Sequence, residues 1–245
     1  INEVGVEQTL YFKQLFEMER VLGWFSEEQR FHLAHGLIRF KDRRMSTRAG
    51  NIVWLDEVLG EAVQRATKLG SDSEELAEMV GIGALKWNDL KRDPKTEIVF
   101  NWDEVLNMEG NSGPYLQYTF ARAKSVLSKL QSTGNQYSSR TGKPVNWSTS
   151  KLVNWSTGLL NKEELSLLRS LPRFSEIIAT AAKNYSPNLL CNYLFDLAQK
   201  YNNFYNVHRI IGSENEEFRL ALTGGVGQVL KNGLSLLGIQ TPERM

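Results

Sequence analysis

The sequence of 245 residues has little of what secreted, disulfide-stabilised and membrane proteins require. Its single cysteine, Cys191, has no partner for an internal disulfide or for a cysteine-based zinc site. This residue lies among leucines, so we expect a small buried hydrophobe and not a nucleophile. The sequence contains no apolar run of roughly 18 to 20 residues, as a membrane span needs, and no secretory signal pattern. These absences favour an intracellular protein, cytoplasmic or in an organelle, that does not use thiol chemistry.

Charge is nearly balanced over the whole chain but not along it. The 29 Lys and Arg and 28 Asp and Glu give a net charge of +1. Residues 1–110 carry 14 Lys and Arg against 20 Asp and Glu, for −6, whereas residues 111–245 carry 15 against 8, for +7. Clustered Lys and Arg strengthen binding to phosphates, so the second half has the charge of an RNA-binding module. Chance unevenness of two solvated surfaces is the alternative.

The first half of the chain has the mixed pattern of an α/β domain. Apolar spacing predicts a helix over residues 6–22, ended by Gly23. Its expected buried face consists of Leu10, Leu15, Met18 and Leu22. Residues 31–40 and 52–55 are β-prone segments on either side of a polar, basic loop.

Two helices are expected after this loop. Asp56 is the expected N-cap of the first, and Gly70 is its expected terminator because glycine adopts the left-handed conformation easily. The spacing Ser71-x-x-Glu74 predicts a capping box for a second helix over about residues 73–91.

The second half of the chain is predicted to be helical. Two glycines, an Asn and Pro114 predict a turn that leads into a helix, and we place a domain boundary near residue 106. Apolar residues three or four apart predict helices over residues 114–131, 161–170, 173–184, 187–206 and 214–237. The last begins with a capping-box spacing, Ser213-x-x-Glu216. The polar residues 132–158, in which Val-Asn-Trp-Ser-Thr occurs twice, are expected to form a loop.

The segment from Lys41 to Asn51 has a composition suited to binding a polyphosphate. It contains four cations, one acid, two hydroxyls and a glycine. Guanidinium groups and backbone N–H groups can wrap phosphates. A mobile basic loop can also stabilise the charge that develops on pyrophosphate when ATP activates a carboxylate. On composition alone, a solvated basic loop is the favoured interpretation.

The run Arg44-Met45-Ser46-Thr47-Arg48-Ala49-Gly50-Asn51 resembles the Lys-Met-Ser-Lys-Ser signature of class I aminoacyl-tRNA synthetases, in the form found in arginyl-tRNA synthetases. The resemblance implies catalytic roles for Arg44, Ser46, Thr47 and Arg48. It implies that the phosphates of ATP, with Mg²⁺ carried by the nucleotide, are bound by Arg43, Arg44, Met45, Ser46 and Arg48. Two positions depart from the signature: Arg44 keeps the charge of the first Lys, and Thr47 removes the charge of the second, which Arg43 or Arg48 could replace.

A second class I signature, His-x-Gly-His, has the same spacing as His32-Leu33-Ala34-His35. We reject this match because Ala34 stands where Gly should let the nucleotide approach, and because the run lies in a predicted strand only nine residues before Arg44. In the family the true motif would be far upstream. The resemblance therefore implies the C-terminal part of a longer enzyme, inactive by itself.

The strongest resemblance is the run Glu-Gly-Asn-Ser-Gly-Pro-Tyr-Leu-Gln-Tyr-Thr-Phe-Ala-Arg at residues 109–122, which is similar to the opening of the anticodon-binding domain of arginyl-tRNA synthetases. Residues 193–206 resemble the family's Asp-Leu-Ala-x-x-Phe-Asn-x-Phe-Tyr helix, and residues 237–245 resemble its Leu-Gly-Ile-x-x-Pro-x-x-Met ending. Residues 4–22 resemble its Val-Gly-x-x-Gln helix.

These matches imply a mainly α protein in two parts. Residues 1–105 would be the C-terminal remnant of a Rossmann-type α/β catalytic domain, and residues 106–245 an all-α anticodon-binding helix bundle. The implied activity is that of an arginine–tRNA ligase, with tRNA, arginine and ATP as partners, no metal site of its own and a monomeric state. The alternatives are a non-catalytic RNA-binding protein that keeps only the bundle, and a helical scaffold without an RNA role.

Candidate RNA contacts lie on two predicted helices. Unstacked anticodon bases are bound by stacking on aromatic or guanidinium groups and by hydrogen bonds to base edges. Tyr118 and Arg122 lie one helical turn apart, and Tyr201 and Tyr205 repeat that spacing. Tyr201 continues an apolar stripe and is expected in the core, which is also the alternative for the other tyrosines. The candidates are Tyr118, Arg122, Tyr205, Asn206 and, because the family's C-terminus lies at the anticodon pocket, Met245.

Overall fold

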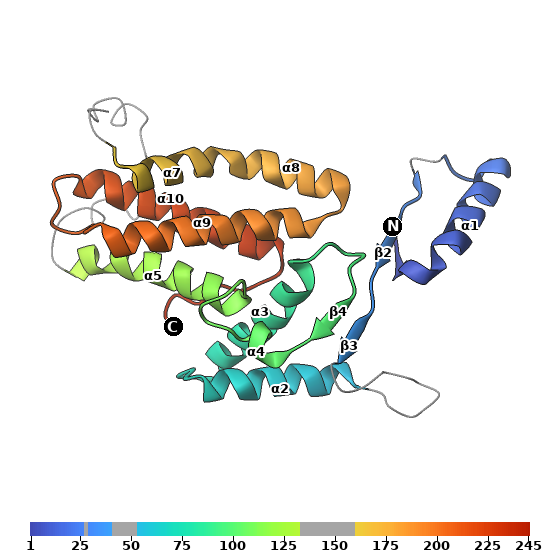
Figure 1. The fold of residues 1–245 in the computed structure, drawn as a ribbon, viewed down its shortest axis with the longest axis horizontal. Helices are drawn as coiled ribbons and strands as arrows, with labels where there is room; N and C mark the ends of the chain where they lie inside the picture. The colour runs from blue at the N-terminus through green and yellow to red at the C-terminus, as the bar shows by residue number, and fades with distance from the viewer. Residues whose placement is uncertain (27–28, 41–52, 133–159) are drawn as a thin grey trace.

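The computed structural model describes residues 1–26, 29–40, 53–132 and 160–245. Within these ranges the fold is mainly helical, with two small parallel sheets in the first half of the chain (Figure 1). One sheet pairs β1 (Asn2–Gly5) with β2 (His32–His35), and the other pairs β3 (Ile38–Phe40) with β4 (Ile98–Phe100). The expected fold class is confirmed.

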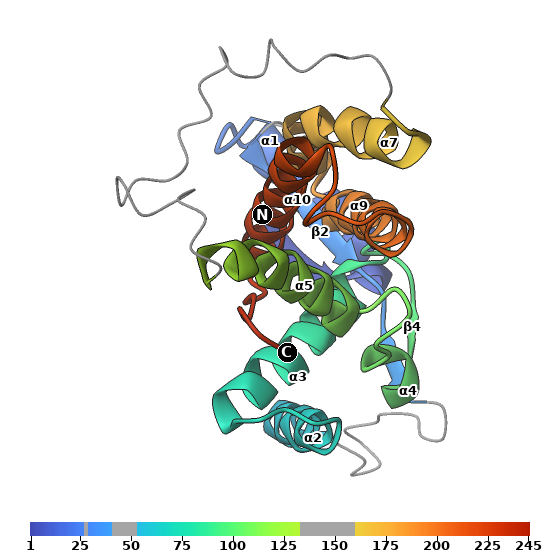
Figure 2. The same ribbon diagram turned by 90° about the vertical axis from the view of Figure 1, so that its left-hand side faces the viewer.

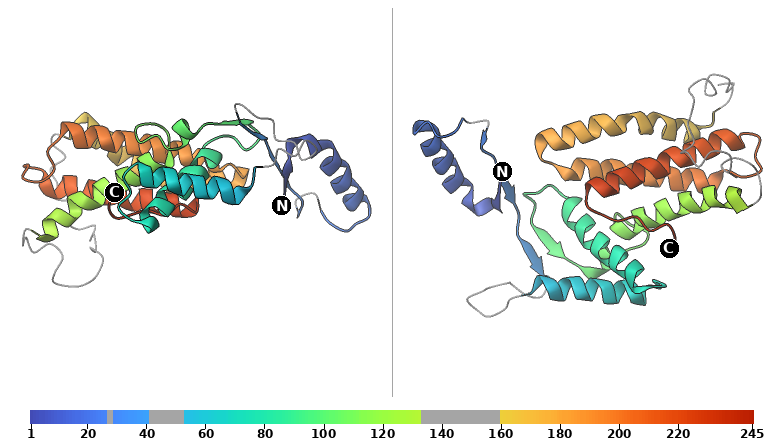
Figure 3. Two further views of the ribbon diagram at one scale, coloured as in Figure 1. Left: turned by 90° about the horizontal axis from the view of Figure 1, so that it is seen from below. Right: turned by 180° about the vertical axis from the view of Figure 1, so that it is seen from behind.

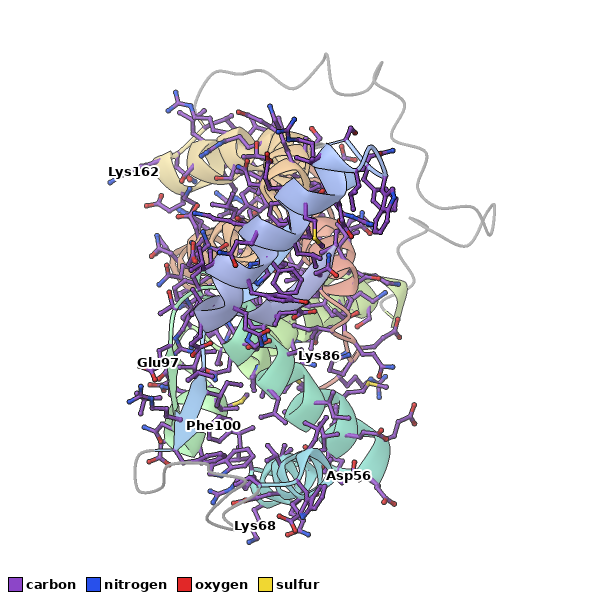
Figure 4. All side chains as sticks on the ribbon, turned by 90° about the vertical axis from the view of Figure 1, so that its right-hand side faces the viewer. Asp56, Lys68, Lys86, Glu97, Phe100 and Lys162 are labelled. Carbon is purple, nitrogen blue, oxygen red and sulfur yellow. The ribbon has the colours of Figure 1, made fainter. Side chains whose placement is uncertain are left out.

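The N-terminal helix exists where the sequence predicted it, but its buried face differs. A short 3-10 helix, η1 (Val6–Gln8), leads into α1 (Thr9–Val21), and Gly23 follows at φ +70°. The expected buried face is wrong, because Leu10, Met18 and Leu22 are exposed. The single buried side chain of α1 is Phe12, whose ring stacks on His32 of β2 at 4.5 Å between centroids. Since α1 stands apart from the bundle in Figure 1 and lies in front of it in the end-on view of Figure 4, one ring suffices to cover its contact with the sheet.

The two helices predicted here are present as α2 (Leu55–Lys68) and α3 (Glu74–Leu90), but their N-caps differ from the predicted ones. The cap of α2 is the extended residue Trp54, and Asp56 lies in the first turn, where its charge faces the positive end of the helix dipole. The strand predicted over residues 52–55 is wrong in its described part, since Leu55 is helical. Gly70 has a φ of +105°, as its predicted role as a terminator requires.

The predicted cap of α3 is also wrong. Ser73, and not Ser71, is the N-cap, and its Oγ accepts a hydrogen bond from the backbone N–H of Leu76 at 3.2 Å. The hydroxyl of Ser71 instead donates to the carbonyl of Ala66 at the end of α2. The two serines of this turn therefore each provide a hydrogen-bond partner for a backbone group at one helix end.

The second half of the chain forms a bundle of helices (Figures 1 and 2). After the single turn α4 (Trp102–Val105), these are α5 (Gly113–Ser132), α7 (Lys162–Ser170), η5 (Leu171–Arg173), α8 (Phe174–Asn184), α9 (Pro187–Val207) and α10 (Glu216–Leu236). All five predicted helices are confirmed. Helix α9 lies at the centre, and its buried stripe includes Leu190, Leu194, Leu197, Tyr201 and Phe204.

Cys191 lies in this stripe and is fully buried, as expected. Removal from water raises the pKa of its thiol to about 12. No helix within the described ranges is long and apolar enough to cross a membrane.

One predicted cap in the bundle is wrong and one true cap was not predicted. The cap of α10 is Asn215, whereas the hydroxyl of Ser213 donates to the carbonyl of Ile210. A reciprocal capping box instead joins Asn161 and Glu164 at the start of α7.

Helix α3 belongs to the core of the bundle although it precedes the expected boundary near residue 106. Trp87 is fully buried in the bundle's core cluster, and its Nε1 donates to Asn111 Oδ1 at 2.8 Å. The backbones of α3 and α5 are so close that a Cβ on Gly113 would lie 2.6 Å from the carbonyl oxygen of Gly83. Figure 2 shows α3 below α5, and in the view from behind α3 lies beside one end of α5 (Figure 3).

Candidate nucleic-acid interface

An arginine between two tyrosines forms the most distinctive surface feature of the bundle. The guanidinium carbon of Arg122 lies 4.8 Å from the ring centroid of Tyr118 and 4.9 Å from that of Tyr205. Both distances are in the range of cation–π attraction. The rings come from different helices, α5 and α9, and remain 37% and 36% exposed. We call these three residues the tyrosine–arginine cluster.

Hydrogen bonds between polar side chains of α5 and α9 hold Arg122 of this cluster in place. Arg122 Nη1 donates to Asn202 Oδ1 at 2.6 Å. Asn202 Nδ2 in turn donates to the hydroxyl oxygens of Tyr115 and Thr119, each at 2.9 Å. The hydroxyl of Thr119 donates to the backbone carbonyl of Tyr115, so the network is tied to the backbone of α5.

Helical spacing explains why these residues meet. Tyr115, Thr119 and Arg122 recur at four and three residues along α5, and Asn202 and Tyr205 are three apart on α9. Asn202 was missed by the sequence analysis, although a polar residue beside the apolar stripe of α9, one turn before Tyr205, was a signal for it.

Tyr201 forms the buried base of the site. It is fully buried, as predicted, and its ring centroid lies 6.3 Å from that of Tyr205. Burial raises the pKa of its hydroxyl well above the ordinary value. Tyr201 therefore supports the exposed ring of Tyr205 from within the core, and cannot itself contact RNA.

The two remaining RNA candidates are both exposed. Asn206 is exposed one residue after Tyr205. Met245 is 38% exposed at the end of a tail that packs along α5. Gln117 Nε2 donates to the carbonyl of Gln240 at 2.8 Å, and the Nζ of Lys124 lies 3.4 Å from the carboxylate of Glu243. At 3.6 residues per turn, Gln117 and Lys124 lie about 130° around α5 from Tyr118 and Arg122, so the tail runs along a different face of this helix.

The phosphate-loop candidates fall between two described stretches of the chain. The six residues Arg43, Arg44, Met45, Ser46, Thr47 and Arg48 lie outside the described residues, as does the repeated Val-Asn-Trp-Ser-Thr. The elements on either side are β3 and α2. His32 and His35 lie in β2, as predicted, and His32 Nε2 is 3.0 Å from the carbonyl oxygen of Val4.

Comparison with protein-family models gives two matches that together cover most of the chain. Residues 116–245 match the model of the DALR anticodon binding domain. Residues 1–102 match the model of the catalytic domain of class I tRNA synthetases (R). The tyrosine–arginine cluster lies wholly within the first match.

Several similar proteins are arginine–tRNA ligases. The chain is 36% identical to the arginine–tRNA ligase of Clostridium beijerinckii, covering 99% of the chain and 42% of that protein, and 35% identical to that of Clostridium kluyveri, covering 100% and 43%. The chain thus spans about 42% of the length of the curated relatives it matches. Among solved structures, the arginyl-tRNA synthetase of Thermus thermophilus superposes with a TM-score of 0.81 at 32% identity, covering 100% of this chain and 40% of that one.

Proposed function

Because the chain belongs to the arginyl-tRNA synthetase family, as catalytic-domain tail and DALR anticodon-binding domain, we propose that it serves in joining arginine to its tRNA with ATP. The helical half would bind the anticodon loop of the tRNA. The first half would contribute the segment that holds the phosphates of ATP. We further propose a boundary between these parts at residues 105 and 106, a monomeric state and a cytoplasmic location.

The tyrosine–arginine cluster is the observation that carries this proposal. An anticodon loop presents unstacked bases and phosphates, which are bound by aromatic faces and by guanidinium groups. Tyr118 and Tyr205 offer exposed rings, and Arg122 offers a cation held between them. Asn206, next to Tyr205, and the exposed Met245 would add further contacts to the RNA.

For the ATP step, the proposal rests on the sequence between β3 and α2. Arg43, Arg44, Met45, Ser46 and Arg48 would bind the phosphates, and Arg44, Ser46, Thr47 and Arg48 would act in catalysis. ATP would supply the leaving pyrophosphate, whose developing negative charge the guanidinium groups would stabilise.

Binding of arginine tRNA at several salt concentrations tests the RNA part of the proposal. We expect the logarithm of the association constant to fall linearly with the logarithm of salt concentration, since released counterions accompany each neutralised phosphate. A tRNA for another amino acid, with a different anticodon, is the control and should bind more weakly. Absence of salt-dependent binding would contradict an RNA role and leave a helical scaffold.

Exchange of pyrophosphate into ATP tests the ligase part. In the longest natural protein that contains this sequence, we expect exchange that depends on arginine. Exchange with another amino acid would overturn the assigned substrate. Binding of tRNA without any exchange would favour a non-catalytic RNA-binding protein.

A further inference from the structure

Arg122 is held in one orientation by contacts on several sides. Its guanidinium lies over the rings of Tyr118 and Tyr205, and one N–H of Nη1 donates a hydrogen bond to Asn202 Oδ1. A guanidinium has five N–H donors, and within the described ranges the bond to Asn202 is the one hydrogen bond found for it. Its other donors have no hydrogen-bond partner among the described residues, while its guanidinium carbon stays within 5 Å of both ring centroids.

Asn202 holds this arrangement because it combines an acceptor and donors in one short side chain. Its Oδ1 accepts a hydrogen bond from Arg122, and its Nδ2 donates hydrogen bonds to the hydroxyl oxygens of Tyr115 and Thr119. An aspartate would lack the donors, and a leucine would lack both functions. Two helices, α5 and α9, are thereby fixed to each other at the point where the guanidinium is presented.

We propose that Asn202 is a positioning residue for RNA recognition: it holds the guanidinium of Arg122 so that its N–H edge meets acceptor atoms of the RNA, while the outer faces of Tyr118 and Tyr205 stack on bases. The inference deepens the proposed function and rests on it. Without Asn202, Arg122 regains the rotamer freedom of a long side chain, and ordering it again opposes binding. Asn202 itself stays below the cluster and does not touch the RNA.

The primary test is the affinity of the full chain for arginine tRNA after Asn202→Ala. Loss of a hydrogen bond to a charged group is expected to weaken binding about tenfold or more. Asn203→Ala is the matched control, because Asn203 is the next residue of the same helix and its side chain is exposed. It should bind like the unchanged chain. Circular dichroism and the urea midpoint establish that each variant is folded.

A double-mutant cycle separates positioning from direct contact or general structure. If Asn202 acts through Arg122, then Asn202→Ala should cause no further loss in the background of Arg122→Ala. The proposal would be overturned if Asn202→Ala weakened binding by the same factor with and without Arg122→Ala. It would also be overturned if Asn202→Ala bound tRNA like the unchanged chain.

A second variant keeps the proposal testable if Asn202→Ala does not fold. Tyr115→Phe removes one oxygen that Asn202 binds and leaves the ring in place. It should weaken binding by a smaller factor, which also disappears in the background of Arg122→Ala. A Tyr115→Phe effect that persists there would contradict the positioning role. If the unchanged chain does not bind tRNA, it is the proposed function that fails, and not this inference alone.

Discussion

The ring of Tyr185 stacks on the ring of Phe31, with 4.1 Å between centroids and 28° between planes. Tyr185 ends α8 in the left-handed conformation, at φ +51°, and is the only residue other than glycine with a positive φ among those described. Phe31 immediately precedes β2. The stack therefore joins the end of the bundle nearest the N-terminal sheet to that sheet, and does so through a residue whose backbone is strained.

Two substitutions of Tyr185 should separate the stabilisation by the ring stack from the cost of the strained backbone. Tyr185→Ala loses the aromatic contact but keeps the left-handed backbone, so we expect the free energy of unfolding to fall by about 1 kcal/mol. Tyr185→Gly loses the same contact but relieves the backbone cost of about 1 kcal/mol, so it should lie close to the unchanged chain. Urea denaturation measures both. A glycine variant less stable than the alanine variant would show that the backbone is not strained there.

The exposed tyrosines of the cluster should contribute to RNA binding through their rings. Stacking of one base on an aromatic ring contributes about 1–3 kcal/mol, so Tyr118→Ala and Tyr205→Ala should each weaken tRNA binding by about 5- to 150-fold. Tyr118→Phe and Tyr205→Phe keep the rings and should bind nearly normally. Fluorescence anisotropy with labelled tRNA provides the affinities. Equal losses for alanine and phenylalanine would assign the contribution to the hydroxyl groups instead.

Glu104 should make stability depend on pH. Hydrogen bonding to Lys91, with the charges of Lys91 and Arg92, lowers the pKa of its carboxyl below the ordinary 4.5. A carboxyl with a lowered folded pKa stabilises the fold above its unfolded pKa, and this contribution is lost as the pH falls through the folded value. Glu104→Gln should therefore destabilise the chain at pH 7, by about 1 kcal/mol or less because Glu104 is partly exposed.

The difference between Glu104→Gln and the unchanged chain should shrink as the pH falls below 4.5. Urea midpoints between pH 3 and pH 7 measure it. Glu78→Gln, on the exposed side of α3, is the control. A difference that stays constant down to pH 3 would show that the ion pair is not its source.

The buried pair of Glu164 and Arg219 should be sensitive to the loss of either partner. Glu164 is fully buried, and its Oε1 accepts from Arg219 Nε at 2.7 Å. Glu164→Ala leaves a nearly buried guanidinium without its carboxylate, so we expect a loss of about 3–5 kcal/mol in the free energy of unfolding. Adding Arg219→Met should recover part of that loss. Additive losses in the double variant would contradict the direct pairing.

Long apolar stripes made the helices predictable. Helix α9 was predicted to within one residue because Pro187 starts it and because its buried stripe runs on to Phe204. Short polar signals were less informative. Ser71 and Ser213 each have the spacing of a cap, but nearby residues compete for the same backbone groups, and tertiary contacts decide among them.

The candidate site was predictable in part. Spacing and family likeness indicated Tyr118, Arg122 and Tyr205, which the structure brings together. The place of Asn202 beside the stripe was a signal, but its partners could not be assigned, since they are 80 to 87 residues away in the sequence. The buried face of α1 was wrong because periodicity shows which side of a helix is apolar, but not whether anything packs against it.

The close backbone contact between Gly83 and Gly113 limits where this sequence can be joined to part of a related sequence. The two glycines lie on opposite sides of the junction expected near residue 106, and neither backbone has a side chain that could yield to a change in the other. In a hybrid that takes its helical half from a related protein, Gly83 and Gly113 would come from two different sequences. Their two backbones would then have to fit each other at this contact although they did not evolve together. A joint placed before Glu74 would transfer both glycines together and preserve the fit.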